Sequence, residues 1–349
     1  MNKGLLSGKY SVLSEDDVQQ IHDMSLKVLQ NQGMMCESDL TLNLFIQNGA
    51  KVDKESRVIF VSPEMIEKAL QSAPKSFVMY GQDPQYDMLA EVGNVFFGMG
   101  GTPEPFIYDH TLHAPRISTK EDMIQCTRVG QALQNVDFIM ALCSARNVPP
   151  EESIFHEWDA IFRNTSKPVI CSSPGKRFTE IYIELAIAAS GGEENFRKRP
   201  WITLFTQPVS PLKITRYSDG MFVAAEYGIP ILASPGPMMG ATSPASLAGT
   251  LVQINAEALF GIVMSQLIKP GTPVVYAPHT GVMDVTTAQC TYGSAEQTLA
   301  RAAVAQLGRY YNLPQFGLGG GVESKIPDAE AASQAMMGMM LNALSRLTL

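Results

Sequence analysis

From residue 94 onward, the chain alternates short apolar runs with longer stretches of helical pattern. Most runs are rich in β-branched or aromatic residues, and most are followed by a loop and a helical stretch. The seven runs are NVFFGMG (94–100), VDFIMALCS (136–144), PVICSS (168–173), WITLFTQ (201–207), IPILAS (229–234), PVVYAP (273–278) and QFGLGGG (315–321). Strands that alternate with helices form βα units and build a parallel sheet. The alternation therefore predicts an α/β fold.

The number of runs narrows the choice of architecture. A (β/α)8 barrel needs eight parallel strands and typically about 250 residues. The sequence ends at ALSRLTL, where an eighth strand would begin. We expect a (β/α)8 TIM barrel over residues 91–349 whose eighth strand is missing from the chain, because an open barrel would expose two parallel strand edges. A doubly wound open sheet is the alternative.

Residues 1–90 have a different pattern and predict a small N-terminal α/β extension. Ser14 precedes three acidic residues, which suit the first turn of a helix, and Gly33 can end that helix. A second helix is followed by a strand pair within 50–61. Ser62, followed by a proline, is typical of the N-cap of a third helix.

Composition excludes several classes of protein. Of the 349 residues, 45% are hydrophobic and 17% are charged, which is typical of a well-packed globule. The net charge of −8 argues against a nucleic-acid-binding protein. Five scattered cysteines without a CxxC motif favour the reducing cytoplasm. The N-terminal MNKGLLSGKY lacks the apolar region of a signal peptide. The longest apolar run, 244–268, contains Gln253, Asn255 and Glu257, so we expect a buried helix and no membrane span.

The ends of the expected strands are where a barrel places its active site. These ends are rich in Gly, Ser, Thr and Pro and carry few charges. They contain no lysine for a buried Schiff base, no metal-ligand spacing and no GxSxG motif, and GLGGG (317–321) is a poor dinucleotide fingerprint. We expect Glu257, in the helix after the fifth strand, to be a buried structural partner of a neighbouring loop.

The uncharged loop at 233–249, ASPGPMMGATSPASLAG, follows the fifth strand. Thr242 or Ser243 with Pro244 is expected to begin the next helix. Small residues would leave room for a flat partner to approach the backbone, whereas the alternative is a tight βα connection packed under other loops.

Four separated stretches resemble the trimethylamine methyltransferase family, including its members without pyrrolysine that demethylate quaternary amines such as glycine betaine. They occur in order along most of residues 10–349: GMGGTPEPFIYD (98–109), QPVSPL (207–212), GATSPASLAGTLVQINAEALFGIVMSQLIKPGTPVVYAP (240–278) and LPQFGLGGGVESKIPDAEA (313–331). The resemblance implies a (β/α)8 barrel and members that run on beyond residue 349, which agrees with a missing eighth strand.

The resemblance also implies an activity, the transfer of a methyl group from a methylated amine to the Co(I) of a separate corrinoid protein. The trimethylamine enzymes carry pyrrolysine inside the barrel, but residues 319–323 read GGGVE here. The expected substrate is therefore a small quaternary amine such as glycine betaine, with a tertiary methylamine as the alternative. The DxHxxG signature of corrinoid carriers is absent, and DHTLHAP (109–115) fails its spacing. We expect cobalamin to be carried by the partner, with no cofactor or metal bound by the chain itself.

A quaternary ammonium is already an activated methyl donor, so the site must mainly orient and hold a desolvated cation. Aromatic faces contribute about 0.5–2 kcal/mol each. Acidic groups could complement the cation or simply cap helices, and the aromatic residues could be barrel core. The expected substrate-binding residues are Phe97, Glu104, Phe106, Phe205, Gln207, Tyr276, His279, Asp284 and Phe316, with His279 for a substrate carboxylate and Glu323 as the catalytic residue.

The corrinoid protein is expected to approach the barrel mouth at the small-residue loop, at Gly236, Met238, Met239 and Gly240. We further expect a cytoplasmic homo-oligomer. Two alternatives stay open at this point: an anion- or phosphate-binding barrel enzyme that uses GLGGG as an anion nest, and a non-catalytic binding protein for quaternary amines.

Overall fold

Six of the seven expected strands form one curled parallel sheet in the computed structural model, which describes residues 1–6, 8, 10–101 and 103–349. Neighbours in this sheet are parallel throughout. Its strands follow the chain in order: β8 (Gly98–Met99), β11 (Phe138–Ile139), β12 (Val169–Ser172), β13 (Ile202–Thr206), β15 (Ile231–Ala233) and β17 (Val274–Tyr276). The prediction of a parallel α/β sheet is therefore confirmed.

The seventh run reaches the sheet only at its first residues. Gln315 forms an isolated parallel bridge with Tyr276, and the Phe316 N donates a hydrogen bond of 3.1 Å to the Tyr276 carbonyl. Residues 347–349 lie next to it, because the Leu349 N donates to the Gln315 carbonyl and the Gly317 N donates to the Leu349 carbonyl, each over 2.9 Å. The described part of the chain therefore contains a curled six-stranded sheet and not a complete barrel.

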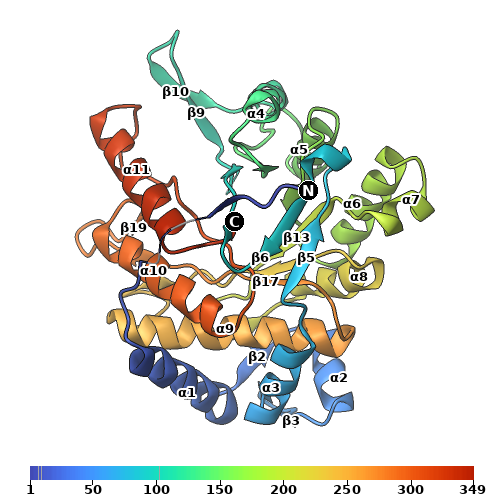
Figure 1. Ribbon diagram of the computed structural model, residues 1–349, viewed down its shortest axis with the longest axis vertical. Coiled ribbons are helices and arrows are strands. Elements are labelled where there is room, and N and C mark those ends of the chain that lie inside the picture. The colour runs from blue at the N-terminus through green and yellow to red at the C-terminus, as the bar shows by residue number, and fades with distance from the viewer. Residues whose placement is uncertain (7, 9, 102) are drawn as a thin grey trace.

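Helices cover the outer face of this sheet (Figure 1). They are α4 (Lys120–Ala132), α5 (Ser153–Phe162), α6 (Lys176–Ala189), α8 (Gly220–Tyr227), α9 (Leu247–Ile268) and α10 (Ala295–Tyr310). Two further helices, α7 (Glu193–Lys198) and α11 (Ala329–Leu344), pack beside α6 and α10, respectively. The expected start of α9 was wrong. Ser246 is its N-cap, with its Oγ accepting from the Gly249 N over 3.3 Å, while the Thr250 Oγ1 donates to the Pro244 carbonyl and ties the preceding segment back.

A hairpin of β5 (Ser76–Met79) and β6 (Met88–Glu91) closes the N-terminal end of the sheet. The Asp83 N, in its turn, donates 3.3 Å to the Ser166 carbonyl, and Asp87 pairs with Arg199 at 2.6 Å. Ser166 and Arg199 precede β12 and β13. The hairpin shares one buried cluster with the inward side chains of the strands, which include Phe138, Ile170, Leu232, Val275 and Phe316. The hairpin thus fills the sheet's interior at the end where the strands begin.

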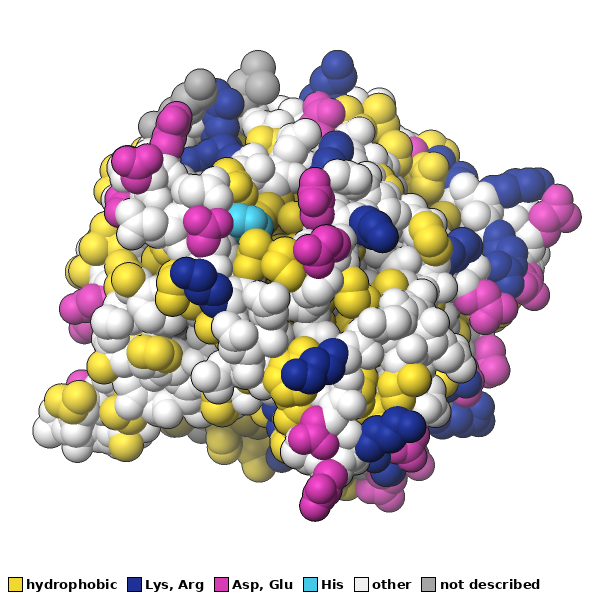
Figure 2. Space-filling view, turned by 90° about the horizontal axis from the view of Figure 1, so that it is seen from below, with side chains coloured by type: hydrophobic (Ala, Val, Ile, Leu, Met, Phe, Trp, Pro, Cys, Tyr) yellow, Lys and Arg dark blue, Asp and Glu magenta, His cyan; other side chains and the backbone are white. Residues whose placement is uncertain are grey.

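The elements expected between residues 14 and 72 are present. Ser14 and Asp17 make a capping box at the start of α1 (Glu15–Asn31), and the other elements are α2 (Asp39–Gln47), β3 (Lys51–Asp53), β4 (Val58–Phe60) and α3 (Pro63–Ser72). In this region α1 and α3 pack along α9 (Figure 1). The face seen from below mixes acidic, basic and hydrophobic side chains (Figure 2). The sequence did not indicate β2 (Met34–Cys36), which pairs with β14 (Lys213–Ile214) and so joins the extension to the larger unit. The boundary at residue 90 stays a prediction.

The expected buried helix is α9. Among the described residues it is the one helix with the length and hydropathy of a membrane span, and 72% of its most apolar window is buried inside the protein. Short elements complete the fold: β1 (Leu5–Leu6), β7 (Asn94–Val95), β9 (Phe106–Asp109), β10 (Ala114–Ile117), β16 (Met238–Met239), β18 (Gly281–Met283), β19 (Cys290–Thr291), and the 3-10 helices Pro84–Tyr86 and Arg216–Asp219.

Candidate active site

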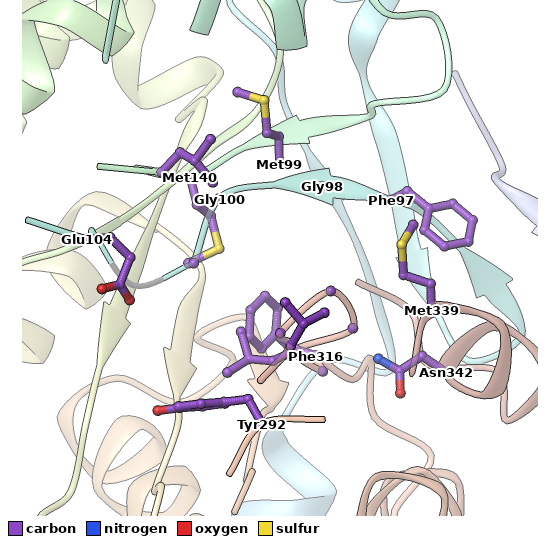
Figure 3. A pocket seen from close by; sticks show the side chains of 18 of the residues that line it. Phe97, Gly98, Met99, Gly100, Glu104, Met140, Tyr292, Phe316, Met339 and Asn342 are labelled. Atoms are coloured by element: carbon purple, nitrogen blue, oxygen red, sulfur yellow. The ribbon is translucent and has the colours of Figure 1, made fainter. Parts of the chain in front are cut away.

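Two adjoining cavities open at the carboxyl ends of the strands. The larger, of about 860 Å³, lies between the segment around β8 and the segment after Phe316 (Figure 3). The smaller, of about 120 Å³, lies over the ends of β11, β12 and β13. Gly101, Met140 and Leu318 line both cavities. The hollow region thus lies at the end of the sheet where the sequence predicts a site.

The larger cavity collects five of the expected site residues. They are Phe97, Glu104, Phe106, Phe316 and Glu323. Glu104 is exposed at the rim, and Phe106 on β9 is 59% exposed, so neither is a desolvated contact. Phe316 is buried, and its ring centroid lies 6.2 Å from that of Phe205 in an edge-to-face arrangement. This aromatic pair connects the two cavities.

Glu323, the expected catalytic residue, holds backbone groups. Its Oε1 accepts hydrogen bonds from the Tyr292 N and, over 3.1 Å, from the Gly293 N. Its own N donates 2.7 Å to the Gln334 Oε1 on α11. Glu323 therefore fixes the loop after strand seven against the segment at 292–293, and its catalytic role stays a prediction.

His279 lines the smaller cavity in a defined tautomer. The Ser234 Oγ donates its one hydrogen to the Ala277 carbonyl over 2.7 Å, so the His279 Nδ1, 2.9 Å from the same Oγ, must be the donor to it. The Nε2 is then an unprotonated acceptor. Burial lowers the pKa of His279 to about 4, so the ring is neutral at physiological pH. Gly236 packs against this ring, because a Cβ there would lie 2.3 Å from the Nε2.

Phe205 and Gln207 also line the smaller cavity. The pleat of β13 explains why both side chains point toward the cavity. Thr203 and Phe205 face one side of the strand, and Leu204 and Thr206 face the other. Gln207 continues this alternation beyond the strand and is exposed, so its amide group lies at the mouth.

Glu157 also lines the smaller cavity, although it was not among the predicted site residues. It lies on α5 and is only 8% exposed. Its Oε1 accepts from the Ser153 Oγ over 3.0 Å and from the Ala145 N over 3.3 Å. Burial raises the pKa of its carboxyl group. One signal could have found it: Glu157 lies four residues after Ser153 and four before Ile161, on the buried face of an amphipathic helix.

Two expected site residues lie outside both cavities. Tyr276 is fully buried on the outer side of β17, where its hydroxyl donates 2.8 Å to the Asn255 Oδ1 on α9 and its ring packs on Tyr311. Asp284 lies in a surface turn, and its Oδ1 accepts from the Thr286 and Thr287 N atoms at 2.7 and 2.9 Å. Tyr276 therefore cannot form part of a cage in this structure, and Asp284 caps a turn.

The small-residue loop is a structured βα connection. Met238 and Met239 form β16, which pairs in parallel with β18, and Met239 is buried. Gly240 has a φ of 87°, a conformation that favours glycine. The approach of a partner at this loop stays a prediction.

Glu257 has the structural role that was expected of it. It is fully buried on α9, its Oε2 accepts from the Ser210 Oγ over 2.6 Å, and its Oε1 accepts from the Leu212 N over 2.8 Å. It therefore anchors the loop after β13. Within the described ranges, no group of three or more His, Cys, Asp or Glu residues is placed to hold a metal ion.

A family model described as trimethylamine methyltransferase (MTTB) matches residues 5–349. Trimethylamine methyltransferase MttB of Desulfitobacterium hafniense (strain DSM 10664 / DCB-2) is 35% identical over 336 residues, which are 95% of this chain and 67% of that protein. Glycine betaine methyltransferase of D. hafniense (strain Y51) is 32% identical over 339 residues, 97% of this chain and 70% of that protein. The crystal structure of monomethylamine methyltransferase MtmB from Methanosarcina barkeri has a TM-score of 0.48 and 14% identity over 97% of this chain and 82% of its own. By the family match and these two curated relatives, the chain belongs to the trimethylamine methyltransferase family.

Proposed function

We propose that the protein transfers a methyl group from a quaternary amine to the Co(I) of a corrinoid partner protein. The observation that carries this proposal is the pair of cavities at the carboxyl ends of the strands, in a chain whose relatives are named trimethylamine and glycine betaine methyltransferases. In parallel α/β barrels this is the end at which catalysis occurs.

Methyl transfer from a quaternary ammonium group requires little acid–base catalysis by the residues of the chain. When an N–CH₃ bond of a quaternary ammonium breaks, the nitrogen keeps the electron pair, and a neutral tertiary amine leaves. The methyl group is taken up by the electron pair of Co(I), which the corrinoid protein supplies as the acceptor. The residues of the chain must hold the cation, exclude water and aim one methyl group at the partner.

The smaller cavity suits the cationic head. Phe205, Trp158 and Met140 give it apolar and aromatic walls, and neutral His279 adds no positive charge. Gln207 at the mouth could donate to a substrate carboxylate. The larger cavity then leaves a path by which the partner can reach the exposed methyl group.

We also propose that the curled sheet is completed into a (β/α)8 barrel by an eighth strand that begins at residues 347–349. These residues hydrogen bond to the chain on both sides, as an eighth strand would. Leu349 bonds to Gln315 and Gly317 of the seventh run, and the Thr348 carbonyl accepts a hydrogen bond of 2.9 Å from the Phe96 N of the first run. Much of the larger cavity lies above this position, between residues 97–101 and 317–321.

Cytoplasmic location and self-association complete the proposal. Five free cysteines support a reducing compartment. Exposed apolar side chains along α11 support a homo-oligomer, with Met336 67% exposed, Met340 48% and Leu344 38%.

The test is a methyl-transfer screen with the full chain and a reduced corrinoid protein. Quaternary amines such as glycine betaine are compared with trimethylamine, and methylation of cobalt is followed spectroscopically. We expect transfer from at least one quaternary amine and none from trimethylamine. Binding of the quaternary amines without any transfer would instead identify a non-catalytic binding protein.

A further inference from the structure

The smaller cavity combines a buried carboxylate with apolar walls. Its lining includes Trp158, Met140, Ile170, Phe205 and Leu318, and its polar side chains are Glu157, Ser172, Gln207 and His279. Trp158, Met140 and Ile170 are each at most 4% exposed, so the walls are largely withdrawn from water. Such a chamber disfavours an uncompensated charge, which makes Glu157 its most unusual group.

Glu157 is only partly satisfied by the protein. Both of its hydrogen bonds reach the Oε1, from Ser153 and Ala145. Among residues 1–6, 8, 10–101 and 103–349, no hydrogen bond or ion pair reaches the Oε2, and the charge of Arg146 acts on the carboxylate only through space. Buried carboxylates are normally paired with a cation, and Glu157 lines a cavity in which a ligand could supply one.

We propose that Glu157 is the counterion of the substrate's quaternary ammonium group, and that it makes the smaller cavity selective for a cationic head over a neutral head of the same shape. This inference rests on the proposed function for the nature of its ligand, and adds the residue that recognises the charge.

The type of cation follows from the other groups of the cavity. A protonated primary or secondary amine would need acceptors for its N–H hydrogens, whereas a quaternary ammonium has none and is satisfied by charge and by aromatic or apolar contact. The aromatic side chains Trp158 and Phe205 supply such contact. Among the lining residues that the structure describes, Glu157 is the one carboxylate, and none is Lys or Arg. His279 is neutral and adds no positive charge beside it.

The experiment compares two small ligands of similar size, tetramethylammonium and tert-butanol, by calorimetric titration of the full chain. We expect the wild type to bind the cation more tightly, and the isosteric Glu157→Gln variant to lose about tenfold or more in affinity for the cation while its affinity for tert-butanol stays the same or rises. Glu151→Gln is the matched control, because it removes an equal charge from an exposed position close to the start of the same helix. It should leave the ratio of the two affinities unchanged.

A second measurement uses the wild type alone, in case the glutamine variant does not fold. Because burial raises the pKa of Glu157, binding of a cation beside it should release a fraction of a proton in a series of titrations between pH 5 and pH 6.5, and tert-butanol should release none. Titrations in two buffers of different ionisation enthalpy measure this release. The charged or titratable groups that face Glu157 or lie behind its neighbours are Arg146, Cys143, Cys171, Tyr182, Asp122, Cys126 and His279. At pH 5.5 His279, with a pKa of about 4, is neutral, and Cys126, with a pKa of about 7, is protonated.

Three results would overturn the proposal: no binding of tetramethylammonium to the wild type, equal losses for both ligands in Glu157→Gln, or no proton release that is specific to the cation. These readouts involve neither a corrinoid nor turnover. Selective binding through Glu157 without methyl transfer would therefore refute the proposed function and support the role of Glu157 as counterion. Methyl transfer that Glu157→Gln leaves unaltered would support the proposed function and refute the role of Glu157.

Discussion

The Nδ1 of His279 donates to the Oγ of Ser234 across 2.9 Å, and this contact leaves the Nε2 of His279 as an unprotonated acceptor in the candidate site. The Ser234 hydroxyl donates its hydrogen to the Ala277 carbonyl, so it can only accept a hydrogen bond from His279. This pair of hydrogen bonds fixes the tautomer of His279. A neutral imidazole in this position is compatible with a cationic ligand, which an imidazolium would repel.

Acidification should destabilise the protein through His279. Its folded pKa is lowered from 6.5 to about 4, so the unfolded chain binds the proton first as the pH falls. The contribution of neutral His279 to the free energy of unfolding is fully present above pH 6.5. It falls by on the order of 3 kcal/mol as the pH drops from 6.5 to 4. Urea denaturation at pH 7 and pH 5 should show a smaller pH dependence for His279→Gln than for the wild type. His110→Gln, at an exposed position, should keep the wild-type slope; equal slopes for all three proteins would contradict the assignment.

Gly236→Ala should disturb the same ring. The added Cβ would lie 2.3 Å from the His279 Nε2, so the imidazole or the loop must move, at a cost of about 1–3 kcal/mol of unfolding free energy. Gly320→Ala is the control, because a Cβ there meets nothing within 4 Å. Chemical denaturation measures both, and a Gly236→Ala variant as stable as the control would show that the ring is not held.

Glu257→Ala should release the loop after β13. It would leave the Ser210 hydroxyl and the Leu212 N without their buried acceptor and should lower the free energy of unfolding by about 2–4 kcal/mol. Glu226→Ala, an exposed carboxylate on α8, should change stability by no more than about 0.5 kcal/mol. If Glu257→Ala matched that control, the anchoring role would be wrong.

Phe205 and Tyr276 should differ in their effect on ligand binding. Phe205→Ala removes a wall of the smaller cavity and should weaken binding of tetramethylammonium severalfold. Tyr276→Phe removes a hydroxyl outside the cavity, so it should lower stability by about 1 kcal/mol through the lost bond to Asn255 and leave ligand affinity unchanged. Calorimetry and denaturation on both variants separate these effects. Weaker ligand binding by Tyr276→Phe would show that Tyr276 contributes to the binding site after all.

The sheet could be predicted from sequence because each strand is a short apolar run followed by a helix. Which side chains of a strand point inward could not, since parallel strands are buried on both faces and carry apolar residues on each. Tyr276 and Phe205 both lie near strand ends, yet Tyr276 faces α9 and Phe205 faces the cavity. The hairpin at residues 76–91 was missed because its two strands have four residues each and pair only with each other, while the contacts that attach them to the sheet, at Ser166 and Arg199, lie far away in the sequence.

The candidate site was predicted only in part, for a related reason. Phe97, Phe316, Gln207 and His279 follow or belong to the expected strands, so the rule about strand ends located them. Glu157 lies on a helix beside the sheet, and its place in the cavity depends on how α5 packs over β12. Helical spacing indicates that Glu157 is buried, but not that it lines a cavity.

In the proposed activity, this chain moves a methyl group from a quaternary amine to a corrinoid protein. The most direct measurement follows ¹³C-methyl-labelled glycine betaine, with related quaternary amines in parallel, by NMR in the presence of the full chain and a reduced corrinoid protein. We expect one labelled methyl group to appear on cobalt for each molecule of tertiary amine formed, and we expect Glu157→Gln to slow this transfer. If no quaternary amine loses a methyl group while the corrinoid protein is present in its Co(I) state, the proposed activity is wrong.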